Sequence, residues 1–196
     1  FVDGRDLRKV LGGESEKEKQ FAPLKPDHAA AVILKLVEIM EYVHKRDLPV
    51  VHRDLKPANI LVTNHRDLDV LTAIGVERDL RLAKFKVMDF GLAGHARPQG
   101  QQDSEYSLGA QFDGKGTTAY MSPQQKRGEP SHPSDDIFAI GVMWYELLAG
   151  KVGFGPPGKR AIESLEKDFQ LRGGTSEQWK VLVDCLDEDR EHRIKN

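Results

Sequence analysis

Apolar residues recur with helical spacing in the stretch DHAAAVILKLVEIMEYVHKR, which follows Pro26. Residues three or four positions apart lie on one side of an α-helix, so the spacing predicts an amphipathic helix here. Asp27 is the expected N-cap, because a carboxylate at that place can accept from free backbone N–H groups. The apolar face consists of Ile33, Leu36, Val37, Met40 and Val43.

Two further stretches near the C-terminal end also predict helices. PSDDIFAIGVMWYELLAG is apolar on nearly every side, which indicates a buried helix ending at Gly150, where glycine permits a left-handed turn. Its apolar core of 14 residues includes Glu146 and is too short and too polar to span a bilayer. SEQWKVLVDCLDEDREHRI predicts one more amphipathic helix and a charged turn.

Short β-branched runs between these helices predict a small ribbon. VVH (50–52) and NILV (59–62) flank a charged loop, and FKVMDF (85–90) is the third strand candidate. Residues 63–84 are too long for a tight hairpin, so we expect a short helix inside them. Residues 91–133 are rich in Gly, Ser, Gln and Pro, which favours a long irregular segment. The predicted class is α+β and mainly α.

Charge and cysteine content narrow the function classes. A net charge of −2 gives no basic field for nucleic acid and no polybasic patch for a membrane. The single cysteine, Cys185, excludes an internal disulfide, and a small buried role suits it better than a nucleophilic one. The opening FVDGRDLRKV lacks the order of a signal peptide. We therefore expect a cytoplasmic globular domain, although 196 residues could also form two small ones.

The charged loop at 52–59 reads HRDLKPAN. A chance match of seven fixed identities is about one in a billion per start position. The segment resembles the catalytic loop of the Hanks-type serine/threonine protein kinase family, H-R-D-L-K-P-x-N. The resemblance implies that Asp54, Lys56 and Asn59 are catalytic, and that His52 and Arg53 have structural or regulatory roles.

The chemistry of phosphoryl transfer agrees with these residue types. The reaction needs a group to orient the hydroxyl, cations near the transferred phosphate, and oxygen ligands for Mg²⁺. Asp54 would accept or orient the hydroxyl proton, Lys56 would act as a point charge, and Asn59 would offer an amide oxygen. The alternative is a charged surface turn without chemistry.

Asp89, Phe90 and Gly91 resemble the family's D-F-G and follow a strand candidate. The resemblance implies that Asp89, together with Asn59, binds Mg²⁺, while Gly91 lets the backbone turn. ATP is the implied nucleotide, bound by Lys56, Asn59, Asp89 and Leu61. The interval from Asn59 to Asp89 is longer than usual in the family, so the ribbon carries an insertion.

GTTAYMSPQQ (116–125) resembles the family's G-T-x-x-Y-M-[AS]-P-E, the end of the activation segment (89–124 here). Thr117 corresponds to the threonine that contacts the catalytic Asp and Lys. Gln124 stands where the family has Glu, whose partner is an arginine matched here by Arg193. We expect a Gln–Arg hydrogen bond in place of an ion pair.

Asp136 corresponds to the aspartate that caps backbone donors of the catalytic loop. An ordinary N-cap role is the alternative, and both could hold together. In the family, an arginine at the position of Arg53 often binds a phosphate on the activation loop. The sequence does not choose among the possible acceptors, which are Ser104, Tyr106, Ser107 and Thr118.

GFGPPGKR (153–160) matches two phosphate-loop patterns, but we interpret it as the loop after the central helix. It follows a helix rather than a strand, and Pro156 and Pro157 lack the N–H groups that a phosphate cradle needs. Arg160 also stands where a P-loop has Ser or Thr.

The resemblance covers residues 1–196 as a partial kinase domain, with FVDGRDL similar to the hinge and the rest similar to the C-terminal lobe. The family's N-terminal lobe supplies a glycine-rich loop and a lysine–glutamate pair, which these residues do not contain. We therefore expect no activity from this chain alone, protein substrates for the complete kinase, and self-association through apolar residues around Phe90, Leu61 and the hinge. A non-catalytic binding module and a small-molecule phosphotransferase of the same fold remain the alternatives.

Overall fold

The structure is a computed structural model that describes residues 4–11, 21–63, 83–90, 94–95, 117–151 and 156–194. Its long helices are α2 (Pro26–His44), α5 (Pro133–Ala149), α6 (Lys159–Leu171) and α7 (Ser176–Cys185). Short helical turns occur at α1 (Leu7–Val10), η1 (Pro57–Asn59), η3 (Thr117–Tyr120) and α4 (Pro123–Lys126). The strands are β1 (Arg5–Asp6), β2 (Val50–Val51), β3 (Ile60–Thr63), β4 (Lys84–Val87) and β5 (Gly94–His95).

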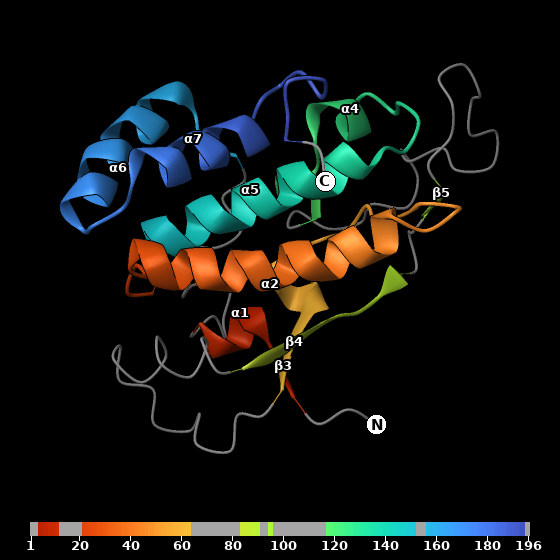
Figure 1. The fold of residues 1–196 in the computed structure, drawn as a ribbon, viewed down its shortest axis with the longest axis horizontal. Helices are drawn as coiled ribbons and strands as arrows, with labels where there is room; N and C mark the ends of the chain where they lie inside the picture. Colours follow the sequence, from red (N-terminus) through yellow and green to blue (C-terminus); the bar gives the residue numbers. More distant parts are fainter. Residues whose placement is uncertain are drawn as a thin grey trace.

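The helices form layers over a small sheet (Figure 1). Helices α2 and α5 lie side by side in the middle, with α6 and α7 on one side and β3 and β4 on the other. Among the described residues, no helix is both long and apolar enough to cross a membrane. The predicted class, mainly α with a small β part, is confirmed.

Helix α2 uses the predicted apolar positions but begins differently at its N-terminus. Ile33, Leu36 and Met40 are buried, and Val37 and Val43 pack against the same core. The prediction of Asp27 as N-cap is wrong. Lys25 is the N-cap, Pro26 begins the helix, and Asp27 lies in the first turn. Proline suits the first helical position because it has no N–H group that would need an acceptor.

Helix α5 is the buried centre of the domain, as its sequence predicts. It ends at Gly150, which has a φ of 67°, so the predicted left-handed turn is confirmed. A Cβ on Gly150 would lie 2.3 Å from the Phe21 carbonyl oxygen. A Cβ on Gly141 would lie 2.8 Å from Cβ of Cys185, so this glycine lets α7 approach α5 closely. Cys185 is buried as predicted, and burial raises the pKa of its thiol to about 12.

The ribbon pairs the two strands that carry the candidate site. Strand β3 lies between β1 and β4 and is antiparallel to both, with Ile60 opposite Val87 and Thr63 opposite Lys84. The Met88 N–H extends the ladder to the Asn59 carbonyl at 2.9 Å. Strand β4 begins one residue earlier than predicted and ends at Val87, so Asp89 and Phe90 lie beyond it.

Several elements differ from the predicted order of one helix, ribbon, loop and two helices. The stretch 91–133 is not wholly irregular, because it contains β5, η3 and α4, and β5 pairs with β2. Helix α6 was not predicted, and it starts within the last residues of the GFGPPGKR segment. Only Phe169 of α6 is fully buried, but Ile162 and Leu165 lie at helical spacing from it and pack against the same core, so the sequence did contain a signal for this helix. The helix expected within 63–84 lies mostly outside the described residues.

Candidate active site

The catalytic-loop carboxylate is held by two neighbours on its own loop. Lys56 Nζ donates to both carboxylate oxygens of Asp54, at 3.0 and 2.8 Å. Asn59 Nδ2 donates to the Asp54 carbonyl at 2.8 Å and to its Oδ2 at 3.0 Å. Asp54 is 9% exposed and Asn59 is 7% exposed. The structure therefore brings together the three residues that the sequence marks as catalytic.

These contacts fix the orientation of the Asn59 amide. Both of its partners in Asp54 are acceptors, so the amide nitrogen must face them. The amide oxygen then lies on the opposite edge of the side chain, where it can serve as a ligand for a hard cation such as Mg²⁺.

Asp136 connects the start of α5 to the catalytic loop. Its Oδ2 accepts the His52 backbone N–H at 2.8 Å, and its Oδ1 accepts that of Arg53 at 2.9 Å. His44 Nε2 from α2 lies 2.8 Å from Oδ2. Asp136 is 1% exposed, and the N-cap of α5 is His132. The predicted capping of the catalytic loop is confirmed, and the ordinary N-cap alternative is wrong.

His52 joins the catalytic loop to the end of β4. The Asp54 backbone N–H donates to His52 Nδ1 at 3.2 Å, and His52 Nε2 lies 2.9 Å from the Met88 carbonyl. Because Nδ1 accepts, the ring proton belongs on Nε2, which donates to Met88. The ring is fully buried and lies 4.6 Å from that of Phe90, centroid to centroid. The sequence indicated a structural role for His52 without specifying these partners.

Asp89 occupies a different setting from Asp54. It follows β4 with a φ of 60° and is exposed, and Phe90 after it is 39% exposed. The Met88–Asn59 hydrogen bond places Asn59 and Asp89 at the same end of the ribbon. In the described part of the chain, no group of three His, Cys, Asp or Glu residues forms a metal site. An amide and a carboxylate at this end would still suit Mg²⁺, which keeps several of its waters.

Other predicted site residues have mixed outcomes. Leu61 on β3 is 7% exposed, with its Cγ 2.8 Å from where a Cβ on Gly4 would lie, so the expectation that it is open to water is wrong. It can still contribute to a floor for a nucleotide. Gly91 and the side chain of Thr117 lie outside the described residues, as do Ser104, Tyr106 and Ser107. Thr118 is exposed.

The expected pair of Gln124 and Arg193 is present and buried. Arg193 Nη2 donates to Gln124 Oε1 at 2.5 Å, and Gln124 Nε2 donates to the Glu188 carbonyl at 2.8 Å. Burial lowers the pKa of Arg193, although Asp135 opposes this. The neutral amide therefore satisfies one donor and one acceptor here, which a carboxylate could not do.

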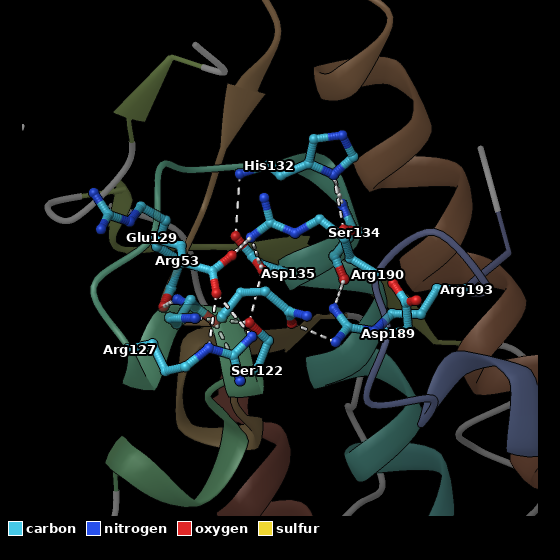
Figure 2. A network of polar contacts seen from close by, with 12 residues as sticks. Arg53, Ser122, Arg127, Glu129, His132, Ser134, Asp135, Asp189, Arg190 and Arg193 are labelled. Carbon is cyan, nitrogen blue, oxygen red and sulfur yellow. Dashed lines mark hydrogen bonds and ion pairs between the residues drawn. The ribbon is translucent and has the colours of Figure 1, made fainter. Parts of the chain in front are cut away.

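Sequence reasoning missed a polar network beside this pair, buried around Asp135 and exposed at Arg127 (Figure 2). Asp135 accepts the Ser122 hydroxyl at 2.7 Å and the His132 N–H at 3.0 Å, and Arg190 lies 3.7 Å away. Burial raises the pKa of Asp135, and its hydrogen bonds and Arg190 offset only part of that effect. Glu129 pairs with Arg127 at 2.7 Å and with Arg190 at 3.5 Å.

Gln125 was missed as well, although the spacing of Ser122 and Gln125 is that of a capping box. Both halves of this box are present at α4. Gln125 Nε2 also donates to the Arg53 carbonyl at 2.9 Å. Arg53 has a φ of 69°, an uncommon conformation for a residue other than glycine. The local motif could have predicted the cap, but only the tertiary fold brings Arg53 to it.

Comparisons with known proteins agree with this geometry. The protein-family model described as "Protein kinase domain" matches residues 1–195. A probable serine/threonine-protein kinase PknB of Corynebacterium glutamicum is 33% identical over 153 residues, which is 78% of this chain and 19% of that protein. A probable serine/threonine-protein kinase PknB of Lactococcus lactis is 32% identical over 170 residues, or 87% and 22%.

A more distant relative gives the same result. The serine/threonine-protein kinase PrkC of Bacillus subtilis is 26% identical over 183 residues, which is 93% of this chain and 23% of that protein. The chain thus spans about a fifth of the length of the curated relatives it matches.

Proposed function

Because this chain belongs to the protein kinase family, we propose that it carries the catalytic loop of an enzyme that transfers the γ-phosphate of ATP to serine or threonine side chains of proteins. The observation that carries the proposal is the arrangement of Asp54, Lys56 and Asn59. The Asp54 carboxylate accepts from the Lys56 ammonium group and from the Asn59 amide nitrogen, which leaves the Asn59 amide oxygen on the opposite edge for a metal ion. A carboxylate, a cation and a free amide oxygen are the set that phosphoryl transfer to a hydroxyl needs.

Each residue has a distinct part in this proposal. Asp54 orients the hydroxyl of the protein substrate and accepts its proton. Lys56 holds the carboxylate in place and presents positive charge where the transferred group passes. Asn59 and Asp89 would hold Mg²⁺ through one amide oxygen and one carboxylate. Bound ATP would supply the phosphoryl group, and Mg²⁺ would neutralise part of its charge.

Serine and threonine are the proposed acceptors for two reasons. The first is the family resemblance, because a lysine two residues after the catalytic aspartate, as Lys56 is after Asp54, is typical of serine/threonine kinases. The relatives are also named serine/threonine-protein kinases. The connected set of Asp54, Lys56 and Asn59 argues against a binding module that has lost its chemistry.

We further propose that residues 1–196 form the hinge and the C-terminal lobe, with the catalytic loop at 52–59 and the activation segment at 89–124. Catalysis then depends on positioning groups outside these residues, namely a glycine-rich loop and a lysine over the phosphates. The 196-residue chain by itself should therefore neither bind Mg-ATP tightly nor turn over. The exposed Phe90 face should favour self-association of that isolated chain.

The test uses the full-length protein that contains this chain. Purified protein is incubated with Mg-ATP labelled at the γ-phosphate and with a general protein substrate, and labelled amino acids are then identified. We expect label on phosphoserine and phosphothreonine, and none with Asp54→Asn. A folded wild-type protein that labels only small molecules, or nothing, would contradict the proposal.

A further inference from the structure

Two neighbouring carboxylates at the start of α5 face different segments of the chain. Asp136 accepts backbone N–H groups of the catalytic loop, from His52 and Arg53. Asp135 accepts the hydroxyl of Ser122, which lies just before α4, at 2.7 Å. Both carboxylates are 1% exposed. The first turn of α5 therefore holds two segments that lie far apart in the sequence.

Gln125 joins these segments on their other side. Its backbone N–H donates to Ser122 Oγ at 3.0 Å, and its Oε1 accepts the Ser122 N–H at 3.1 Å. Its Nε2 reaches across to the Arg53 carbonyl at 2.9 Å. Hydrogen bonds thus run from Asp135 through Ser122, Gln125 and Arg53 to Asp136, and the α5 backbone closes the ring.

Two members of this closed set of hydrogen bonds are buried, so the loss of one bond is costly. Ser122 is fully buried and Gln125 is 6% exposed, so water cannot easily replace a lost partner. Arg53 also needs support, because its φ of 69° is unfavourable without surrounding contacts that hold it. Its carbonyl belongs to the peptide that leads into Asp54, so any displacement of that carbonyl turns Asp54.

We propose that Gln125 is a positioning residue for Asp54, tying the 117–126 segment to the catalytic loop so that the two are placed together. This inference rests on the proposed function, because it assigns Gln125 a role in the same phosphoryl transfer. Gln125 does not touch the reacting atoms, and it acts through the Arg53 carbonyl. Its loss should lower kcat and leave the KM for Mg-ATP unchanged, since Asn59 and Asp89 remain in place.

The chain offers a matched control in a second capping box. At the start of α7, Gln178 Oε1 accepts the Thr175 N–H at 3.1 Å, and the Gln178 N–H donates to Thr175 Oγ1 at 3.2 Å. Glutamate at either position keeps this acceptor and still caps its helix. Gln125→Glu alone removes the donor to the Arg53 carbonyl. It also places a carboxylate at a site that is 6% exposed, so a variant without added charge is needed beside it.

The experiment measures hydrogen exchange over residues 50–56 and steady-state kinetics in the full-length protein. Gln125→Glu should speed exchange in that segment and lower kcat about tenfold, with the KM for Mg-ATP within about twofold of wild type. Gln178→Glu should match wild type in both. Gln125→Met removes the same donor without adding charge, but it also removes the acceptor of the Ser122 N–H. Its control is Gln178→Met, which loses the acceptor of the Thr175 N–H and no bridge. Gln125→Met should reproduce both effects, and Gln178→Met should show neither.

Exchange over 50–56 that is equal in the wild type and both Gln125 variants would overturn the proposal, whatever their activity. Faster exchange with an unchanged kcat would overturn it too, because the bridge would then hold the loop without positioning Asp54. A wild-type protein that transfers no phosphate would instead refute the proposed function. The exchange comparison would still decide whether Gln125 ties the two segments.

Discussion

Asp54 and Asp89 are both proposed to act in one reaction, yet the protein holds them in opposite ways. Asp54 is 9% exposed, and its carboxylate accepts hydrogen bonds from Lys56 and Asn59. Asp89 is exposed and follows the end of β4 in a left-handed conformation. The loop that carries Asp54 is fastened by α5, by α4 and by the ring of His52.

This difference indicates a division of labour. A group that must orient a hydroxyl needs a fixed direction, which buried hydrogen bonds provide. A ligand for Mg²⁺ needs reach and access to solvent, because this ion keeps several of its waters. The surroundings of Asp54 therefore suit the transfer step, and those of Asp89 suit metal and nucleotide binding.

Removing the charge of Asp54 should have the largest effect. Asp54→Asn keeps the shape of the side chain but loses the proton acceptor, so kcat for phosphorylation of a protein substrate should fall on the order of 10²–10⁴-fold. Steady-state assays of the full-length protein measure this. A fall of less than tenfold in a folded variant would show that Asp54 does not handle the proton.

Removing the contacts by which His52 joins the catalytic loop to the end of β4 should have the next largest effect. His52→Phe retains a ring against Phe90 but leaves the Met88 carbonyl and the Asp54 N–H without their partner. We expect a loss of about 2 kcal/mol in the free energy of unfolding. Urea unfolding measures it, with His192→Phe on the exposed turn as a control that should change little. Equal effects at both positions would contradict the linking role.

A smaller effect is expected at the buried pair of Gln124 and Arg193. Gln124→Glu gains an ion pair with Arg193 but places a carboxylate oxygen against the Glu188 carbonyl, which now accepts from the amide. The two effects oppose each other, so we expect a change within about 1 kcal/mol in the free energy of unfolding. A loss well above that range would show that the donor to Glu188 dominates this anchor.

The smallest expected effect is a dependence on pH at Asp135. Burial raises the pKa of this carboxyl in the folded protein, so the folded state binds the proton more readily than the unfolded chain does. The contribution of Asp135 to the free energy of unfolding is therefore greatest below the usual aspartate pKa, about 4. It is lost as the pH rises from that value through the raised pKa of the folded protein.

Asp135→Asn should remove this fall, because asparagine does not titrate. Free energies of unfolding, measured by urea between about pH 4 and pH 7, give the two slopes. Asp189→Asn on the exposed turn is the control and should keep the wild-type slope. Identical slopes in the wild type and Asp135→Asn would contradict the effect of burial.

The sequence predicted those parts of the site that a local motif encodes. HRDLKPAN marked Asp54, Lys56 and Asn59, and strand patterns correctly placed β3 and β4 on either side of the long interval between Asn59 and Asp89. Helix α5 and its end at Gly150 followed from a continuous apolar run and a glycine.

What the sequence did not reveal depends on contacts between distant segments. Gln125 looks like an ordinary capping residue until the fold brings the Arg53 carbonyl within 2.9 Å. The family resemblance predicted the partners of Asp136, but nothing in the sequence indicated that the adjacent Asp135 accepts from Ser122. Helix α6 could have been predicted, because Ile162, Leu165 and Phe169 recur at helical spacing and pack against the core.

The division of labour between Asp54 and Asp89 is tested most directly by calorimetric titration of the full-length protein with Mg-ATP. Asp54→Asn should bind Mg-ATP with nearly wild-type affinity, because this residue serves the transfer step. Asp89→Asn should lose the Mg²⁺-dependent part of the affinity, because a ligand of the ion is gone. Equal losses in the two variants, or a greater loss with Asp54→Asn, would contradict the assignment of the two carboxylates.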